Sequence, residues 1–320
     1  MNDLSAPSVS VILPILNEES DLENCITAIL QQDYDGELEV ILALGPSKDS
    51  TDLIAQKIAA KDKRVKLVKN PTGLTAAGLN LAIKASSFEI ICRIDGHAEI
   101  SKTYIKSAVS IMKETGAVNV GGIMFADSDQ GLQRTVAQAM RSKLGVGPSK
   151  FHTGGGAGES ETVYLGTFKK SAILAAGGFD ERFIRAQDWE LNYRIRKQGG
   201  LIWFDPRLVV TYRPRKTFSK LARQYFQYGR WRRVITRTHS NTSSLRYLAP
   251  PFAVVVNLFS LVSGVFVTPL LLLPLMVYIF TMVIGGFLIG RKITDKLLMP
   301  LVLATMHMSW GLGFITSPKN

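Results

Sequence analysis

Cysteine is scarce in this chain, which has two among its 320 residues, Cys25 and Cys92. The pair shows none of the close spacings of zinc or redox motifs, which excludes a cysteine-bound metal and a disulfide scaffold. We expect both thiols to be reduced in the core. The sequence also lacks a Gly-Lys-Ser/Thr phosphate loop, which argues against P-loop enzymes. No basic region followed by an apolar stretch opens the chain, so we expect no signal peptide.

Acidic residues are almost absent from the C-terminal part. Residues 206–320 contain one acid against 15 Lys and Arg, whereas residues 1–205 contain 25 acids against 23. Eleven of the basic residues lie between Arg207 and Arg246, directly before an apolar tail. Because this is positive-inside patterning, we expect the N-terminal domain in the cytoplasm and the basic segment at anionic lipid headgroups. We expect no nucleic acid partner.

Charge of either sign is missing between Arg246 and Arg291. That length suffices for two membrane spans of about 20 residues each, with a break near Thr268. A further apolar segment, residues 297–316, either makes a third span or lies in the interface. We therefore expect a multi-pass protein of the plasma membrane. Its predicted parts are a catalytic domain over residues 1–240, a basic juxtamembrane region at 206–246, and a membrane domain at 247–320 with helices at about 248–267, 269–290 and 297–316.

Apolar runs of strand length alternate with segments of helical periodicity in the first third of the chain. We predict strands at residues 8–16, 39–44, 65–68 and 88–94, and helices at 22–30, 51–60 and 73–85, with Leu53 facing inward. This alternation indicates a Rossmann-like, doubly wound parallel sheet that binds ligands outside the carboxyl ends of its strands. Polar loops at residues 17–18, 45–49 and 95–97 should therefore share one rim.

The second half is less regular. We predict strands at residues 118–125, 162–169 and 201–204, a Gly-rich loop at 151–160, and helices at 188–198 and 218–237.

Asp95 and His97 follow the strand at residues 88–94. One oxygen and one imidazole ligand suit Mg²⁺ or Mn²⁺ that also bridges a diphosphate. The alternative is an Asp-Gly turn beside a surface histidine. The position at a strand end favours the metal.

Asp188 and Glu190 open the helix predicted at residues 188–198. An ionised carboxylate there can take the proton of an acceptor hydroxyl. Alternatively, a carboxylate there caps the helix and complements its dipole. We expect one of the pair to cap and the other to catalyse.

Gln227, Arg230 and Trp231 lie on the basic helix at residues 218–237. Gln227 and Trp231 are one helical turn apart, so Trp231 can stack on a sugar while Arg230 meets phosphate oxygens. A basic interfacial helix anchored by Trp231 is compatible with the same pattern.

These motifs, in this order, resemble the inverting family 2 glycosyltransferases of the GT-A fold, and most closely their succinoglycan-biosynthesis type of membrane-associated transferase. The resemblance covers about residues 7–240. The family's opening strand ends in Pro-x-x-Asn-Glu, matched by residues 14–18, and its Asp-x-Asp or Asp-x-His metal motif is matched by residues 95–97. Its Glu/Gln-Asp pattern and its Gln-x-x-Arg-Trp motif are matched by residues 187–188 and 227–231.

The resemblance implies a role for each matched position. Asp188 would be the base that inverts the anomeric centre in one displacement, while Arg230 and the metal stabilise the leaving diphosphate. The resemblance implies that the donor nucleotide binds at Pro14, Asn17, Glu18, Asp49, Arg93 and Asp95. It implies that the acceptor and the diphosphate bind at Gln187, Trp189, Glu190, Gln227, Arg230 and Trp231. It implies that Asp95 and His97 bind Mg²⁺ or Mn²⁺.

The loop after the second strand departs from the family pattern. Family members commonly have an aspartate there that meets the nucleotide base, whereas this chain has Leu44, which accepts no side-chain hydrogen bond. Asp49 is retained, so a nucleotide is still expected. A UDP-sugar is favoured by the family, while Leu44 argues against fixing the base as uracil.

The prediction is therefore a membrane-anchored enzyme that moves a sugar from a nucleotide diphosphate sugar to a lipid-linked or glycan acceptor, in envelope or extracellular polysaccharide synthesis. One alternative is an inactive scaffold that binds a nucleotide sugar. A second alternative is a nucleotidyltransferase on a similar fold, although such an enzyme would require a Gly-rich first loop that carries Lys or Arg.

Overall fold

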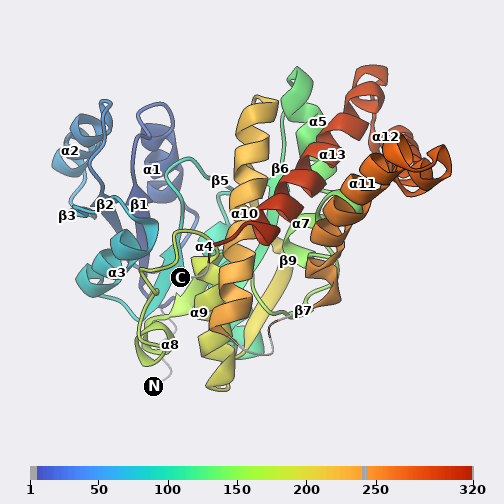
Figure 1. Cartoon of the computed structure of the whole chain (residues 1–320). Coiled ribbons are helices and arrows are strands. Elements are labelled where there is room, and N and C mark those ends of the chain that lie inside the picture. Colours follow the sequence, from blue (N-terminus) through green and yellow to red (C-terminus); the bar gives the residue numbers. More distant parts are fainter. Residues whose placement is uncertain (1–5, 240–241, 243, 319–320) are drawn as a thin grey trace. The chain divides into compact units, whose positions relative to one another are not determined.

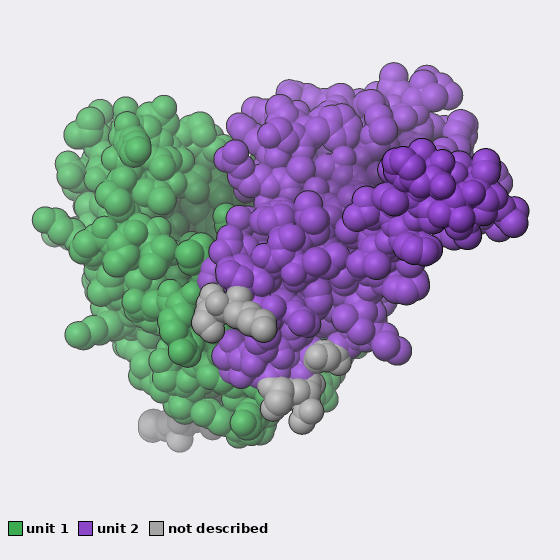
Figure 2. Space-filling view, in the orientation of Figure 1, with its two compact units in different colours: residues 1–125, 154–212 green, residues 126–153, 213–320 purple. Residues whose placement is uncertain are grey.

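The structure is a computed structural model that describes residues 6–239, 242 and 244–318. The chain forms two compact units (Figure 2). Unit 1 contains residues 1–125 and 154–212, and unit 2 contains residues 126–153 and 213–320. The two units are compact groups of residues in contact and are not the predicted domains, so a catalytic domain that ends at residue 240 stays a prediction.

Unit 1 is built on a mixed sheet, nine strands of which lie in the described residues. Its first half is parallel, in the order β3-β2-β1-β4. These strands are β1 (Val9–Ile15), β2 (Leu38–Leu44), β3 (Val65–Lys69) and β4 (Ile90–Arg93), and they are connected by helices α1 (Leu22–Leu30), α2 (Thr51–Lys61) and α3 (Thr75–Ala85) (Figure 1). β1 and β2 are nearly continuous buried runs, as strands covered on both faces require. The doubly wound arrangement is confirmed here.

The second half of the sheet is antiparallel where it joins the first. β8 runs antiparallel to both β4 and β6, and β9 pairs antiparallel with β5 and β7. The strands are β5 (Glu99–Ile100), β6 (Asn119–Ala126), β7 (Gly158–Glu159), β8 (Tyr164–Lys169) and β9 (Ile202–Tyr212), with helices α4 (Tyr104–Thr115), α8 (Lys170–Ala175) and α9 (Gln187–Lys197). The purely parallel sheet expected from the first third is therefore only half of the observed sheet.

Several local predictions were wrong. Leu53 is 60% exposed, because α2 turns Thr51 and Ala55 toward the sheet and not the neighbouring position. Helix α4 was missed, although it buries Tyr104 and Ile105. The segment predicted as a Gly-rich loop contains a short helix, α7 (Lys150–Thr153), and strand β7. Strand β9 continues eight residues beyond the predicted end at 204, to Tyr212.

Unit 2 is helical in the part that the structure describes. A short group, α5 (Gly131–Met140), α6 (Lys143–Val146) and α7, precedes the return to unit 1. The C-terminal elements are α10 (Phe218–Thr238), η1 (Leu245–Tyr247), α11 (Ala249–Phe266), η2 (Pro269–Leu272), α12 (Leu273–Ile289) and α13 (Ile293–Ile315). Three segments of the described residues are long and apolar enough to cross a membrane: Ala249–Phe266, Pro269–Ile289 and Ile293–Ile315.

Helices α10 and α13 pack closely within unit 2, as Figure 1 shows. A Cβ added at Gly229 of α10 would lie 1.9 Å from the carbonyl oxygen of Trp310. A Cβ at Gly313 of α13 would lie 2.0 Å from the carbonyl oxygen of Phe226. Neither distance is possible for a real side chain, so these glycines allow the two backbones to touch.

Candidate active site

The loops that follow β1 and β2 are hydrogen-bonded to each other in unit 1. The Asn17 side-chain oxygen accepts from the Lys48 amide at 2.8 Å, and the Glu18 amide donates to the Thr51 hydroxyl at 2.8 Å. Asn17 has a φ of 55°, a left-handed conformation that asparagine tolerates better than most residues. The sequence prediction that these loops share one rim is therefore confirmed.

Asp49 supports this loop pair. One of its carboxylate oxygens accepts from the Thr51 hydroxyl at 2.5 Å and from the Thr51 amide at 3.1 Å. The other accepts from the Glu19 amide at 3.4 Å. The hydroxyl of Thr51 lowers the pKa of Asp49 below its ordinary value, so the carboxylate is ionised at neutral pH. Pro14 lies one strand position from the end of β1, opposite Ala43.

The loop after β4 brings His97 to the first loop. His97 Nδ1 lies 2.8 Å from Glu18 Oε1. Gly96 lets the two loops approach, since an added Cβ there would lie 2.8 Å from Ile15 Cδ1 and 3.1 Å from Glu18 Cγ. The hydrogen bond to Glu18 raises the pKa of His97. With Nδ1 turned to the carboxylate, Nε2 is the nitrogen of His97 that remains for a ligand.

Arg93, the last residue of β4, joins two carboxylates. Its side chain is 5% exposed and contacts Asp95 Oδ1 at 3.0 Å through Nη2. Its Nη1 is hydrogen-bonded to Asp188 Oδ1. Burial lowers the pKa of Arg93, but the two carboxylates offset that effect and hold the pKa above its ordinary value. A permanently charged guanidinium therefore holds residues 95 and 188 in one cluster.

Asp188 lies in the first turn of α9, with its side chain 28% exposed. Burial raises its pKa most strongly, Asp95 raises it further, and Arg93 opposes both. The net result is a carboxyl group with a raised pKa. A carboxylate with these properties, still partly open to solvent, suits a general base.

The other predicted residues of α9 are more deeply buried than Asp188. Gln187 is 7% exposed and Glu190 is 1% exposed, and Glu190 forms an ion pair with Arg194 at 2.6 Å. Trp189 is 7% exposed and stacks on Tyr193 with ring centroids 5.6 Å apart. Their predicted role at the acceptor and diphosphate stays a prediction, and their burial favours an indirect one.

The expectation that one carboxylate caps this helix was wrong. The N-cap residue is Ala186, and no side chain makes a cap hydrogen bond. Ala186 has a φ of 61°, a left-handed conformation that costs a residue with a Cβ about 1–2 kcal/mol. Asp188 bonds to Arg93 and Glu190 to Arg194, so both carboxylates have other partners.

The Gln-x-x-Arg-Trp segment lies on α10 in unit 2. Gln227, Arg230 and Trp231 are all partly exposed. The carbonyl oxygen of Arg230 accepts from the Ser317 hydroxyl at 3.2 Å, which attaches this turn to the end of α13. The predicted contact of Arg230 with phosphate stays a prediction.

The end of β4 offers donor atoms of the kind that a divalent ion takes. The hydrogen bonds from Arg93 go to Oδ1 of Asp95, so among the described residues Oδ2 receives none. Together with Nε2 of His97, this gives one oxygen and one nitrogen donor. Among the residues described, no group of three or more His, Cys, Asp or Glu side chains is placed to hold a metal. Two protein ligands suit a Mg²⁺ or Mn²⁺ ion that takes its other ligands from phosphates and water.

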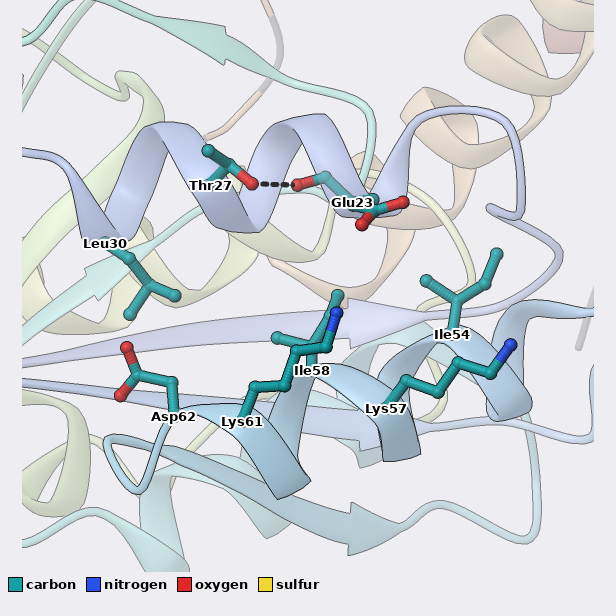
Figure 3. A pocket seen from close by; sticks show the side chains of 8 residues that line it. All are labelled: Glu23, Thr27, Leu30, Ile54, Lys57, Ile58, Lys61 and Asp62. Carbon is teal, nitrogen blue, oxygen red and sulfur yellow. Dashed lines mark hydrogen bonds between the residues drawn. The ribbon is translucent and has the colours of Figure 1, made fainter.

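A separate cavity of about 540 Å³ opens between α1 and α2 (Figure 3). Glu23 and Thr27 of α1 face Lys57 and Lys61 of α2 across it. None of the predicted site residues line this cavity, so it is not part of the cluster around Arg93.

Comparisons with known proteins show the family of the chain. The sequence profile of glycosyl transferase family 2 matches residues 10–173, a stretch that contains the three loops. The chain belongs to this family. It is therefore a glycosyltransferase, and the alternative of a nucleotidyltransferase is not supported.

Two relatives match this family 2 enzyme over nearly its whole length. Succinoglycan biosynthesis protein ExoA of Rhizobium meliloti (strain 1021) is 30% identical over 317 residues, which are 98% of this chain and 96% of that protein. The dolichyl N-acetyl-alpha-D-glucosaminyl phosphate 3-beta-D-2,3-diacetamido-2,3-dideoxy-beta-D-glucuronosyltransferase of Methanococcus voltae is 25% identical, covering 96% of this chain and 95% of that protein.

A solved structure shares the fold of this family 2 enzyme. Mannosyltransferase PcManGT from Pyrobaculum calidifontis, in complex with GDP-Man and Mn²⁺, has a TM-score of 0.60 and 18% sequence identity. The match covers 98% of this chain and 89% of that one. It confirms the predicted GT-A fold followed by long apolar helices.

Sequence reasoning missed three features of the site. The contact of Arg93 with Asp188 joins residues 95 positions apart, and no local pattern signals it. Ser47 and Thr51 were also missed, although both hydroxyls accept from backbone amides of the first loop. For Thr51 a signal was present, since Asp-x-Thr before a helix is typical of side-chain hydrogen bonding to the local backbone.

Proposed function

We propose that this family 2 enzyme transfers a sugar with inversion from a nucleoside diphosphate sugar to a hydroxyl of a lipid-linked or glycan acceptor. The observation that carries the proposal is the cluster in which one buried guanidinium, Arg93, holds Asp95 and Asp188 together. It supports a donor diphosphate at Asp95 and a base at Asp188, two groups that an inverting transferase must bring together.

The proposed reaction is a single displacement. The acceptor hydroxyl oxygen forms a bond to the anomeric carbon, and the bond from that carbon to the donor phosphate oxygen breaks with both electrons. Asp188 takes the hydroxyl proton. The products are the glycosylated acceptor, a nucleoside diphosphate and a protonated Asp188, which returns its proton to water.

Arg93 prepares Asp188 for that task. Burial and the charge of Asp95 raise the pKa of Asp188, and Arg93 counteracts them. Because a base must be ionised to accept a proton, Arg93 keeps the group usable near neutral pH. The same contact fixes the orientation of the carboxylate, which matters because a base acts within hydrogen-bond distance of the proton.

Asp95 and His97 would hold Mg²⁺ or Mn²⁺. When bound, such an ion neutralises charge on the leaving diphosphate. Glu18 would act through His97, since its carboxylate holds Nδ1 of the imidazole and leaves Nε2 as the ring nitrogen available to an ion. Arg230 is proposed as a further cation for the diphosphate, supported by its place in the Gln-x-x-Arg-Trp segment.

For the donor we propose two classes of nucleotide sugar, which differ in the base. UDP-sugars are the first choice for the family. Leu44, at the end of β2, accepts no side-chain hydrogen bond, and the Asp49 oxygens already accept from Thr51 and Glu19. Because the structurally similar mannosyltransferase PcManGT is in complex with GDP-Man, we place GDP-sugars beside UDP-sugars as candidate donors.

The proposed location is the cytoplasmic face of the plasma membrane. Three apolar helices support membrane association, and the 11 basic residues between Arg207 and Arg246 support a cytoplasmic catalytic domain. The relative ExoA is named for succinoglycan biosynthesis, which supports a role in making an envelope or extracellular polysaccharide.

The test is release of nucleoside diphosphate by the purified full chain in detergent with added membrane lipids. A panel of UDP- and GDP-sugars is assayed with Mn²⁺, with Mg²⁺ and with EDTA. We expect turnover of one donor, lost with EDTA and in Asp95→Ala. Asp62→Asn is the control, because Asp62 pairs with Arg64 away from the cluster. Donor binding without turnover would favour the scaffold alternative, and turnover that resists EDTA would refute the metal.

A further inference from the structure

Asn80 of α3 binds the backbone of a residue in the loop before α9. That loop, residues 177–186, follows α8 and leads to Asp188, and we call it the base loop. Its Phe179 amide donates to Asn80 Oδ1 at 2.8 Å, and Asn80 Nδ2 donates to the Phe179 carbonyl oxygen at 2.9 Å. Asn80 Nδ2 also donates to Glu181 Oε1 at 3.0 Å. One side chain therefore satisfies both backbone groups of a residue 99 positions away.

The start of the base loop is tightly packed around this contact. The Phe179 side chain is 2% exposed and packs edge-on against Phe168 of β8, with ring centroids 6.5 Å apart. Two glycines precede it, Gly177 and Gly178, with φ of 83° and 77°. A Cβ added at Gly178 would lie 2.9 Å from Asn80 Oδ1. Because that distance is too short for a real Cβ contact, Asn80 can hold its position only when residue 178 lacks a side chain.

The base loop is also linked to α9 at its beginning. Arg194 of α9 is hydrogen-bonded through Nη1 to the carbonyl oxygen of Ala176, the residue directly before the loop. The loop and the helix that carries Asp188 therefore form one closed segment, and Asn80 attaches this segment to α3. Helix α3 connects β3 to β4, the strand that carries Arg93.

The last residue of the base loop is strained. Ala186 has a left-handed φ of 61°, and Asp188 lies two positions further on. A residue with a Cβ stays in that conformation only where its surroundings hold it. Phe183 supplies one anchor, since it is 3% exposed and its amide donates to the Asp180 carbonyl oxygen at 3.1 Å. The hydrogen bonds of Asn80 supply a second anchor, at the start of the loop.

We infer that Asn80 is a positioning residue, which places Asp188 for the transfer by anchoring the base loop. In this role Asn80 acts through the backbone of residues 179–188 and not on the reacting atoms. The role rests on the proposed function, since it requires that Asp188 is the base. A base must lie within hydrogen-bond distance of the acceptor hydroxyl, and a misplacement of about 1 Å can cost about 10²-fold in rate. An anchor that fixes the loop before the base therefore bears on kcat.

The first measurement gives the kcat and the donor Kd of Asn80→Ala, with the UDP- or GDP-sugar that the native chain turns over. Because the hydrogen bonds of Asn80 go to the base loop, we expect kcat at saturating substrates to fall about 10–100-fold. The donor Kd should change by less than about threefold. A native kcat, or a loss confined to donor affinity, would overturn the inference.

A pair of glycine variants perturbs the same contact from the other side. Gly177 and Gly178 both have a positive φ, so Gly177→Ala and Gly178→Ala both strain the backbone. Only Gly178→Ala places a Cβ against Asn80, whereas a Cβ at Gly177 meets nothing within 4 Å. We expect kcat of Gly178→Ala to be lower than that of Gly177→Ala by about tenfold. Equal kcat values in the two variants would overturn the inference.

A double-mutant cycle separates positioning of the base from a general loss of structure. In the Asp188→Asn background, Asn80→Ala should lower kcat by less than about threefold, because the group that Asn80 positions is already gone. A loss as large as in the native background would overturn the inference.

The same cycle distinguishes failure of the positioning role from failure of the proposed base. Native turnover of Asn80→Ala beside an impaired Asp188→Asn would overturn the positioning role alone. Native turnover of Asp188→Asn would overturn the proposed base, and the role of Asn80 with it.

Discussion

Replacing Arg93 by methionine tests whether the guanidinium at the end of β4 tunes the proposed base. Methionine keeps much of the volume of the buried side chain and removes its charge. Asp95 and Asp188 would then face each other without the cation that joins them. Two effects should follow, one on stability and one on the pH dependence of the rate.

The stability effect follows from two charge-assisted contacts. Each is worth about 1.5–3 kcal/mol when both partners are desolvated. The side chains of Asp95 and Asp188 are 23% and 28% exposed, so water recovers part of the loss. We expect the free energy of unfolding to fall by about 3 kcal/mol in total.

The rate effect follows from the pKa of Asp188. Burial and Asp95 raise this pKa, and Arg93 is the group that opposes them. Without Arg93 the pKa of Asp188 therefore rises further above its ordinary value. Since the base must be ionised, the acid limb of kcat/KM against pH should move to higher pH.

The assay is nucleoside diphosphate release across a pH series, with thermal unfolding measured beside it. Arg194→Met is the matched control, because it breaks the 2.6 Å pair with Glu190 on the same helix but leaves Asp188 paired with Arg93. We expect the control to lose stability without moving the acid limb. An Arg93→Met enzyme whose acid limb coincides with that of the control would refute the reasoning.

Three further predictions concern other contacts. Glu18→Gln should weaken Mn²⁺ binding about 10–100-fold, because Glu18 orients His97. The affinity is measured by calorimetry without donor, and an unchanged affinity would exclude that role of Glu18. Burial lowers the pKa of His152 to about 4, so its stabilising contribution is complete above about pH 6.5 and falls as the pH drops toward 4. The contribution of His152 to the free energy of unfolding should therefore drop by about 2 kcal/mol between about pH 7 and pH 5, and in His152→Phe the total drop over this range should be smaller by about that amount. Gly229→Ala should destabilise the protein by about 1–3 kcal/mol, because the added Cβ clashes with Trp310. Gly156→Ala is the control and should be neutral, because a Cβ at Gly156 meets nothing within 4 Å. Equal melting temperatures of the two variants would contradict this packing.

The sequence predicted the first half of the fold because local periodicity and strand ends decide it. Strands β1 to β4 and their helices follow from apolar runs and helical spacing, and the polar loops at their carboxyl ends meet as a parallel sheet requires. The exposed Leu53 shows the limit of this reasoning, since a helix with few apolar residues leaves its inward face ambiguous by one position.

The contacts that define the site were less predictable. Asp188 was singled out as a base, but its contact with Arg93 depends on where α9 meets the end of β4, and 95 residues separate the two. Glu18 and His97 are 79 residues apart and meet because Gly96 leaves room between two loops.

The most direct test of the account is the turnover of Asp188→Asn at saturating donor, with donor affinity measured separately. Asparagine keeps the shape of the side chain and cannot accept the acceptor proton. We predict that kcat falls about 10²–10⁴-fold while the donor Kd changes by less than about threefold. A variant that retains donor binding and turns over within about tenfold of the native rate would contradict the assignment of Asp188 as the base.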